Sequence, residues 1–207
     1  GTPVPAISLY VTARPDTGEI LAHESRLERV SVRENLRHHV LEPEITEAAL
    51  ADPTISLPYD AWIRPLWQLA QRLTQQREIM RGKPENNTRA EYSFYLDGDP
   101  DDADTPVRIV RRQRNSPLDR IVAEYMILAN STWAGLLNSR GVPGIFRAQQ
   151  TGRVRMSTHA LPHESIGVAQ YAWCTSPLRR YVDLVNQWQL IAVIEHGVSA
   201  ALVAPFK

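Results

Sequence analysis

The chain has 207 residues, 43% of them hydrophobic and 22% charged, which is enough to bury a sizeable core in one or two domains. Lysine plus arginine and aspartate plus glutamate both total 23, so the composition excludes a protein that binds nucleic acid through a strong overall positive charge. A single cysteine excludes an internal disulfide, and the lack of about 18 consecutive apolar residues or a signal-peptide pattern predicts a cytoplasmic protein without a membrane span.

A hairpin and two helices are predicted in the first part of the chain. Residues 6–12 and 19–22 are apolar segments on either side of the sequence PDTG at 15–18, a combination typical of two strands joined by a β-turn. Helical patterns follow at residues 33–42 and 60–80. In the longer helix, the apolar side chains that recur at roughly helical spacing are Trp62, Leu66, Leu69, Leu73 and Ile79.

A second hairpin is predicted from residues 92–96 and 107–110, which are joined by an acidic segment at 97–104. Its alternating aspartates resemble a calcium loop, but Asp102 and Arg108 stand where that loop needs a glycine and a bidentate glutamate. We therefore predict a solvated turn, because aspartate and glycine suit turns and like charges stay hydrated. The basic run that follows, at 111–114, favours an exposed strand end over a phosphate site.

A long helix is predicted to begin at Pro117. Ser116 suits the N-cap, proline suits the first helical position, and Gly141 predicts the stop. The apolar stripe along this helix consists of Ile121, Val122, Tyr125, Met126, Ala129, Thr132, Trp133, Leu136 and Leu137. Glu124 falls outside the stripe, and spacing alone predicts that it pairs with Arg120 on a solvated face.

A further helix with the same Ser-Pro-Leu start is predicted from Pro177 to Gly197. Its polar face holds Arg179, Asp183 and Asn186, and its predicted buried stripe is Leu178, Tyr181, Val182, Val185, Trp188 and Ala192. Two arginines in the first turn are unusual, because the positive end of the helix dipole disfavours cations. Either a phosphate relieves this charge, or Asp183 neutralises Arg179 at a spacing of four residues. Spacing alone leaves both interpretations open.

Three segments resemble the ribonuclease II and ribonuclease R family. The sequence TSPLRRY at 175–181, followed by Asp183, is similar to the family's Thr-Ser-Pro-Ile-Arg-Arg-Tyr signature. The sequence IVAEYMILAN at 121–130 resembles the family's glutamate-bearing helix, and VPGIFR at 142–147 resembles the strand after it. Order and spacing also agree with the family. Before these segments, the likeness rests on the first hairpin and on Glu24-Ser25.

The resemblance implies an α+β fold of antiparallel hairpins and long helices, in a processive 3′-to-5′ exoribonuclease. Such an enzyme threads the 3′ end of single-stranded RNA into a channel and releases nucleoside 5′-monophosphates, using two Mg²⁺ ions held by aspartates. By motif match, Arg179 is the catalytic arginine, which stabilises charge on the scissile phosphate. The RNA contacts implied in this chain are Glu124, Arg180, Phe94, Ser176 and Tyr171. For Phe94 the implied contact is base stacking, although its strand pattern alone predicts a core residue.

The family's clustered aspartates have no counterpart in this sequence. Asp16, Asp52 and Asp60 stand alone, and the acidic segment at 97–104 lies in the wrong order along the chain to take the metal role. We therefore predict no metal ligands, and we interpret 1–207 as a single domain. It corresponds to the C-terminal part of an RNB-type catalytic domain, without the aspartate cluster or flanking RNA-binding domains. Alone, it is expected not to hydrolyse RNA.

Two alternatives from other functional classes remain open: a non-catalytic RNA-binding relative, and a phosphate-handling enzyme that shares only the second helix start. The exoribonuclease interpretation requires Arg179 and Glu124 to face a common groove. Trp173 and Cys174 replace the family's commoner histidine and phenylalanine, which marks a divergent branch. Catalysis by Cys174 with His163, or a metal site built on histidines, is disfavoured because each needs further partners. The sequence sets no oligomeric state.

Overall fold

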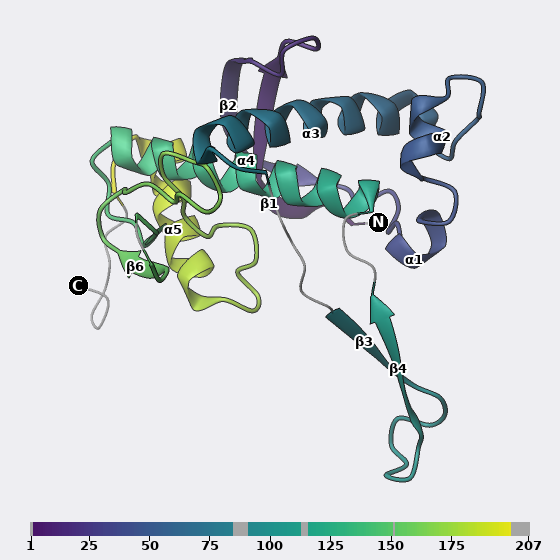
Figure 1. The fold of residues 1–207 in the computed structure, drawn as a ribbon. Helices are drawn as coiled ribbons and strands as arrows, with labels where there is room; N and C mark the ends of the chain where they lie inside the picture. Colours follow the sequence, from purple (N-terminus) through teal and green to yellow (C-terminus); the bar gives the residue numbers. More distant parts are fainter. Residues whose placement is uncertain (1, 85–90, 113–115, 151, 200–207) are drawn as a thin grey trace.

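The computed structural model describes residues 2–84, 91–112, 116–150 and 152–199 (Figure 1). The strands in these ranges form three separate two-stranded antiparallel sheets, and the helices pack around two hydrophobic core clusters. This arrangement confirms the predicted α+β fold of antiparallel hairpins and long helices. None of the helices described is both long and apolar enough to cross a membrane.

The first hairpin joins β1 (Val4–Ala13) to β2 (Ile20–Val30) and confirms the predicted strand pair. Both strands are longer than the sequence pattern indicates. Gly18 adopts a left-handed φ of +72° in the turn between them, a conformation that glycine reaches at little cost. On the inner side, Ile7 and Leu9 pack against the second hydrophobic core, so the hairpin is anchored to the helices.

The helix predicted at 33–42 is largely wrong. Only the four-residue helix α1 (His38–Leu41) forms there, and the residues before it are irregular. Pro43 limits this helix, because proline donates no N–H and disfavours a helical conformation in the residue before it. A second short helix, α2 (Glu47–Ala51), begins at Thr46, whose side-chain oxygen accepts a first-turn N–H (3.1 Å).

Two long helices, α3 (Asp60–Arg81) and α4 (Pro117–Ser139), pack against each other at the centre of the fold (Figure 1). The bounds of both helices agree with the predicted helices at 60–80 and from Pro117. The first hydrophobic core between and beside them includes Ile45, Leu50, Ile63, Trp67, Ala70, Leu118 and Ile121. The buried stripe of α3 is rotated from the predicted one, since Trp62 is 42% exposed and Ile79 is 79% exposed. The reason is that α4 packs on the neighbouring face of α3.

The two ends of α4 follow their sequence signals. Ser116 accepts a first-turn backbone N–H at its side-chain oxygen (3.1 Å), and Gly141 has a φ of +62° just beyond the last turn. Within the helix the predicted stripe is only partly correct. Val122 is 45% exposed, whereas the polar residues Glu124 and Asn130 are buried.

The second Ser-Pro-Leu segment does not start a helix. Residues 177–179 form a turn, and α5 (Tyr181–His196) begins a full turn later than predicted, although it ends at Gly197 as expected. Leu178 is fully exposed and Tyr181 is 55% exposed, so the predicted buried stripe is wrong at its start.

The buried face of α5 is partly polar, because polar side chains there satisfy backbone groups of other segments. Asn186 is completely buried, and its side chain accepts the Ile145 N–H (2.8 Å) and donates to the carbonyls of Ile145 (3.0 Å) and Trp173 (2.9 Å). Leu190 and Val193 on the same helix enter the second hydrophobic core, together with residues of α4. The prediction that α4 and α5 lie near each other is confirmed.

The second hairpin, β3 (Glu91–Leu96) with β4 (Val107–Arg112), is confirmed and projects away from the helices (Figure 1). Its acidic tip is an exposed turn as predicted, in which aspartate side chains accept backbone N–H groups (3.0 Å). Phe94 is 68% exposed, so its expected place in a core is wrong. Residues 113 and 114 of the basic run lie outside the described residues.

The third hairpin, β5 (Phe146–Ala148) with β6 (Arg155–Ser157), leads into a loop that docks on α3. In this loop Gly167 has a φ of +77°. A Cβ atom at this position would lie 2.3 Å from the carbonyl oxygen of Arg77. The two backbones therefore approach so closely that only glycine fits.

We expect Gly167→Ala to lower the free energy of unfolding by about 2 to 4 kcal/mol, because it adds a backbone clash to the strain of a left-handed φ. Gly152→Ala is the matched control: Gly152 has a φ of +72°, but a Cβ added there would have nothing within 4 Å. This control should lose only about 1 kcal/mol. Urea denaturation measures both, and equal losses would contradict the close approach.

Candidate functional site

Glu124 forms a buried ion pair with Arg77, which joins α4 to α3. Arg77 Nε donates to Glu124 Oε2 (2.9 Å), Arg77 Nη2 donates to Oε1, and Thr74 Oγ1 also donates to Oε1 (2.8 Å). Glu124 is 3% exposed and Arg77 is 8% exposed. The predicted pairing of Glu124 with Arg120 on a solvated face is therefore wrong. Arg120 instead lies over the ring of Trp67 (5.2 Å).

A cavity of about 210 Å³ opens beside this ion pair. Besides Glu124 and Arg77, it is lined mainly by apolar residues of α3, α4 and the docked loop, among them Leu73, Met80, Ile127, Leu128 and Val168. A carboxylate offers about four acceptor positions, and Arg77 and Thr74 take three of them, which leaves one at Oε2. Arg179 is not among the residues that line this cavity, and the common groove for Arg179 and Glu124 stays a prediction.

The two arginines before α5 have different surroundings. Arg180 Nη2 donates to Asp183 Oδ1 (2.7 Å), which also accepts the backbone N–H of Ser176 (2.8 Å). Arg179 is exposed, and its Nη2 donates to the Ser176 hydroxyl oxygen at 3.3 Å. Of the two interpretations left open for Arg179, the pairing with Asp183 is therefore wrong, because the turn at 177–179 presents Arg180 to Asp183 instead.

Arg180 also belongs to a cation–indole stack, formed by Arg147, Trp173 and Arg180. The guanidinium carbons of Arg147 and Arg180 lie 4.3 Å and 4.4 Å from the ring centre of Trp173. Strand β5 positions Arg147, whose backbone N–H donates to the carbonyl of Tyr171 (2.7 Å). No role was predicted for Arg147 from the sequence. Its one signal is its place at the end of the family-like segment at 142–147, where none of the neighbouring side chains is charged or nucleophilic.

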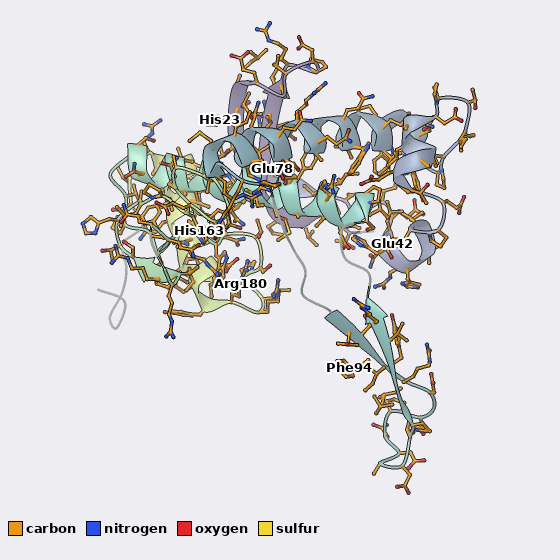
Figure 2. The ribbon with its side chains drawn as sticks, viewed as in Figure 1. His23, Glu42, Glu78, Phe94, His163 and Arg180 are labelled. Carbon is orange, nitrogen blue, oxygen red and sulfur yellow. The ribbon has the colours of Figure 1, made fainter. Side chains whose placement is uncertain are left out.

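Tyr171 supports this region from inside the protein. Its hydroxyl accepts from Asn130 Nδ2 (3.2 Å), while Asn130 Oδ1 accepts the backbone N–H of Cys174 (2.9 Å). Burial raises the pKa of the Tyr171 phenol, and burial lowers the pKa of His163, whose ring meets Tyr171 edge-on with centroids 5.8 Å apart. Both side chains are therefore neutral at pH 7. Figure 2 labels His163 and Arg180 in this part of the molecule.

Cys174 is completely buried in the second hydrophobic core. Burial raises the pKa of its thiol far above neutrality, so no appreciable thiolate is present at physiological pH. This environment supports the expectation that Cys174 is a packing residue and not a nucleophile.

Within the described ranges, His38, Glu42 and Asp119 form a group with metal-like spacing, in which the ligand atoms lie within 4.8 Å of one another. Glu42 Oε1 accepts the hydroxyl of Ser116 (2.9 Å), and His38 Nδ1 lies 3.5 Å from Asp119 Oδ1. Mg²⁺ takes oxygen ligands and usually keeps several waters, so the imidazole of His38 makes this group differ from the aspartate cluster that a pair of magnesium ions would need. Figure 2 places Glu42 well away from Arg180.

The buried glutamate of α4, the arginines before α5 and the hairpins around them define an α+β domain with the fold of exoribonucleases of known structure. An active-site mutant of the Dss1 exoribonuclease from Candida glabrata aligns with 87% of this chain, with a TM-score of 0.67 and 21% identity. Mycoplasma genitalium RNase R aligns with 92% in a complex with ribose-methylated single-stranded RNA and with 93% in a complex with double-stranded RNA, with TM-scores of 0.69 and 0.70 and 13% identity in both.

The chain belongs to the RNB domain family, because the family model for the RNB domain matches residues 1–156 and 149–196. The human 3′-5′ exoribonuclease HELZ2 is 50% identical over 38 residues, which are 18% of this chain and 1% of that protein. The chain also spans only 28% of the Dss1 chain and 37% to 43% of the RNase R chains in the two RNA complexes. It therefore corresponds to a minor part of each relative.

Proposed function

We propose that this chain is part of the catalytic domain of a cytoplasmic 3′-to-5′ exoribonuclease that hydrolyses single-stranded RNA processively to nucleoside 5′-monophosphates. The observation that carries the proposal is the RNB domain match, which includes α4 and the segment at 175–181. Support for an RNA ligand comes from the RNase R complexes, whose fold this chain shares.

In this proposal Arg179 is the catalytic arginine. Its side chain is exposed, and its hydrogen bond with Ser176 is long, so little in the described structure keeps it from reaching a phosphate. Ser176 and Arg180 border the same phosphate. Tyr171 is buried and contributes indirectly, because its hydroxyl accepts from Asn130, whose side chain holds the Cys174 backbone. Phe94 offers an exposed ring on β3, which suits base stacking.

We assign Glu124 to the ribose of a bound nucleotide. The acceptor position that Arg77 and Thr74 leave at Oε2 suits a hydroxyl donor, and a ribose 2′-hydroxyl is the group that distinguishes RNA from DNA. The nucleotide would approach through the cavity beside the ion pair, which Glu124 lines. Arg77 orients the carboxylate through two hydrogen bonds, so it acts as a positioning residue.

The proposal assigns the magnesium chemistry to residues outside this sequence. In the proposed enzyme, aspartates would hold two Mg²⁺ ions, and the chemistry that the ions would supply is a water nucleophile of lowered pKa. The described residues supply no fitting site, since the group of His38, Glu42 and Asp119 includes an imidazole in place of an aspartate and Glu42 lies away from Arg180. We therefore interpret 1–207 as one domain, the C-terminal part of the catalytic domain, and assign it no hydrolytic step of its own.

The second candidate function is that of a non-catalytic RNA-binding relative. It is favoured by the absence of an aspartate cluster from the sequence, in which the densest acidic segment is the exposed tip of the second hairpin. The two candidates share the RNA site and differ only in hydrolysis by the longer protein.

The isolated chain should bind single-stranded RNA and leave it intact. With a 5′-labelled oligo(A) and Mg²⁺ or Mn²⁺, fluorescence anisotropy should rise while gel electrophoresis shows only full-length RNA, because the metal ligands are absent. Release of AMP by this chain would contradict the assignment. The parent protein should shorten the same RNA from its 3′ end, whereas the second candidate function predicts binding without shortening.

A further inference from the structure

The cation–indole stack of Arg147, Trp173 and Arg180 concentrates positive charge at one place. Arg180 is paired with Asp183, but among the described residues no carboxylate pairs with Arg147. Two cations therefore share one acid, and the positive end of the α5 dipole adds to the same field, because Arg180 is the N-cap residue of that helix.

Hydrogen-bond donors in the stack are also left unused. A guanidinium has five N–H donors, and the Nε atoms of both arginines are buried without a partner among the residues that the structure describes. Arg180 has an unused acceptor beside it, since Asp183 Oδ2 is also buried without a partner among the described residues. Buried polar groups in native proteins are nearly always satisfied, so the unused donor of Arg147, which pairs with no carboxylate in the described ranges, indicates a missing acceptor.

Burial and a neighbouring cation both disfavour the positive charge of Arg147. Burial lowers the pKa of Arg147, and repulsion from Arg180 lowers it further. The indole face of Trp173 attracts both guanidinium groups and offsets part of this cost. Trp173 thereby fixes the position of two cations whose charges are not fully balanced, which is an arrangement suited to an anion.

We propose that Arg147 is an RNA-binding residue that binds a backbone phosphate together with Arg180, and that Trp173 positions the two arginines. Both arginine side chains are only partly buried, so part of each reaches the surface. A phosphodiester presents two acceptor oxygens with one negative charge, which match the guanidinium fork better than they match an ammonium group. This inference rests on the proposed function, because it takes the ligand to be RNA.

Arg147→Met tests the inference in the full 207-residue chain. Anisotropy with a labelled oligo(A) should show about fivefold to tenfold weaker binding, and the slope of log K against log salt should fall by about 0.7, as expected for one lost phosphate contact. The control is Arg155→Met, which removes the same charge from an exposed position on the paired strand β6 and should change affinity less than twofold. Arg147→Met should weaken the binding of the matching oligo(dA) by the same factor, because the lost contact is with a phosphate, which RNA and DNA share.

Each outcome separates the inference from the function on which it rests. No RNA binding by the wild-type chain would overturn the proposed function, and this inference with it. Wild-type binding with equal affinities for Arg147→Met and Arg155→Met would leave the proposed function intact and overturn the role of Arg147, as would a loss confined to RNA. If Arg147→Met does not fold, Arg147→Lys decides: binding about threefold weaker than wild type is expected, because lysine keeps the charge without the planar fork, and wild-type affinity would overturn the inference.

Discussion

Glu124→Ala is expected to lower the free energy of unfolding by about 3 to 5 kcal/mol, one of the largest effects of any single change in this chain. The substitution removes the carboxylate that pairs with the buried Arg77 guanidinium between α3 and α4. It also removes one of the two acceptors near the Thr74 hydroxyl, which keeps only the Ala70 carbonyl (3.0 Å). Urea denaturation followed by circular dichroism measures the loss.

Two further variants show whether burial causes this loss. Glu47→Ala removes an acid whose ion pair with Arg120 is exposed, and it should cost less than about 0.5 kcal/mol. The double variant Arg77→Met with Glu124→Met removes both charges together, so it should be more stable than Glu124→Ala. A loss below about 1 kcal/mol for Glu124→Ala would show that the pair contributes little to the native state.

Arg179→Ala in the parent enzyme is expected to lower kcat by about 10² to 10³ and to change RNA affinity much less. A donor aimed at charge that grows in the transition state contributes more there than in the ground state. Arg179→Lys should restore activity only in part, because lysine lacks the planar fork. Single-turnover hydrolysis of a labelled RNA measures the rate of the chemical step.

The environments of the two arginines predict a division of roles that this experiment checks. Arg180 is held by Asp183 and Trp173, so Arg180→Ala should weaken RNA binding more than it slows hydrolysis. Single-turnover rates for Arg179→Ala within threefold of wild type would show that Arg179 is only a solvated surface residue.

Most of the fold could be predicted from the sequence, because its signals are local. The turn sequence before Gly18 predicts the first hairpin, and the cap at Ser116 with the proline after it predicts α4. The helix expected at 33–42 fails because its pattern has too few apolar positions to be held by packing, and Pro43 follows directly. The start of α5 is misplaced because the Ser176 N–H bonds to the Asp183 side chain.

The candidate site could be predicted only in part, because its contacts join residues far apart in the sequence. Glu124 and Arg179 are recognised from their motifs, but the partner of Glu124 lies on another helix, 47 positions earlier. The polar pattern of α5 also assigns Asp183 to a solvated helix face, although its side chain is completely buried. Periodicity measures which side chains are apolar, and it does not detect a polar group whose hydrogen bonds are supplied by a distant segment.

The second hairpin is expected to unfold separately from the helical part of the described chain. Strands β3 and β4 make their principal contacts with each other, and an isolated two-stranded hairpin is at best marginally stable in water. Its amide hydrogens should therefore exchange with solvent through local opening, whereas those of α3 and α4 exchange only when the Arg77–Glu124 pair and the core around it come apart. The ring of Phe94 is thus presented on a marginally stable unit, and under the proposed function RNA binding would order it.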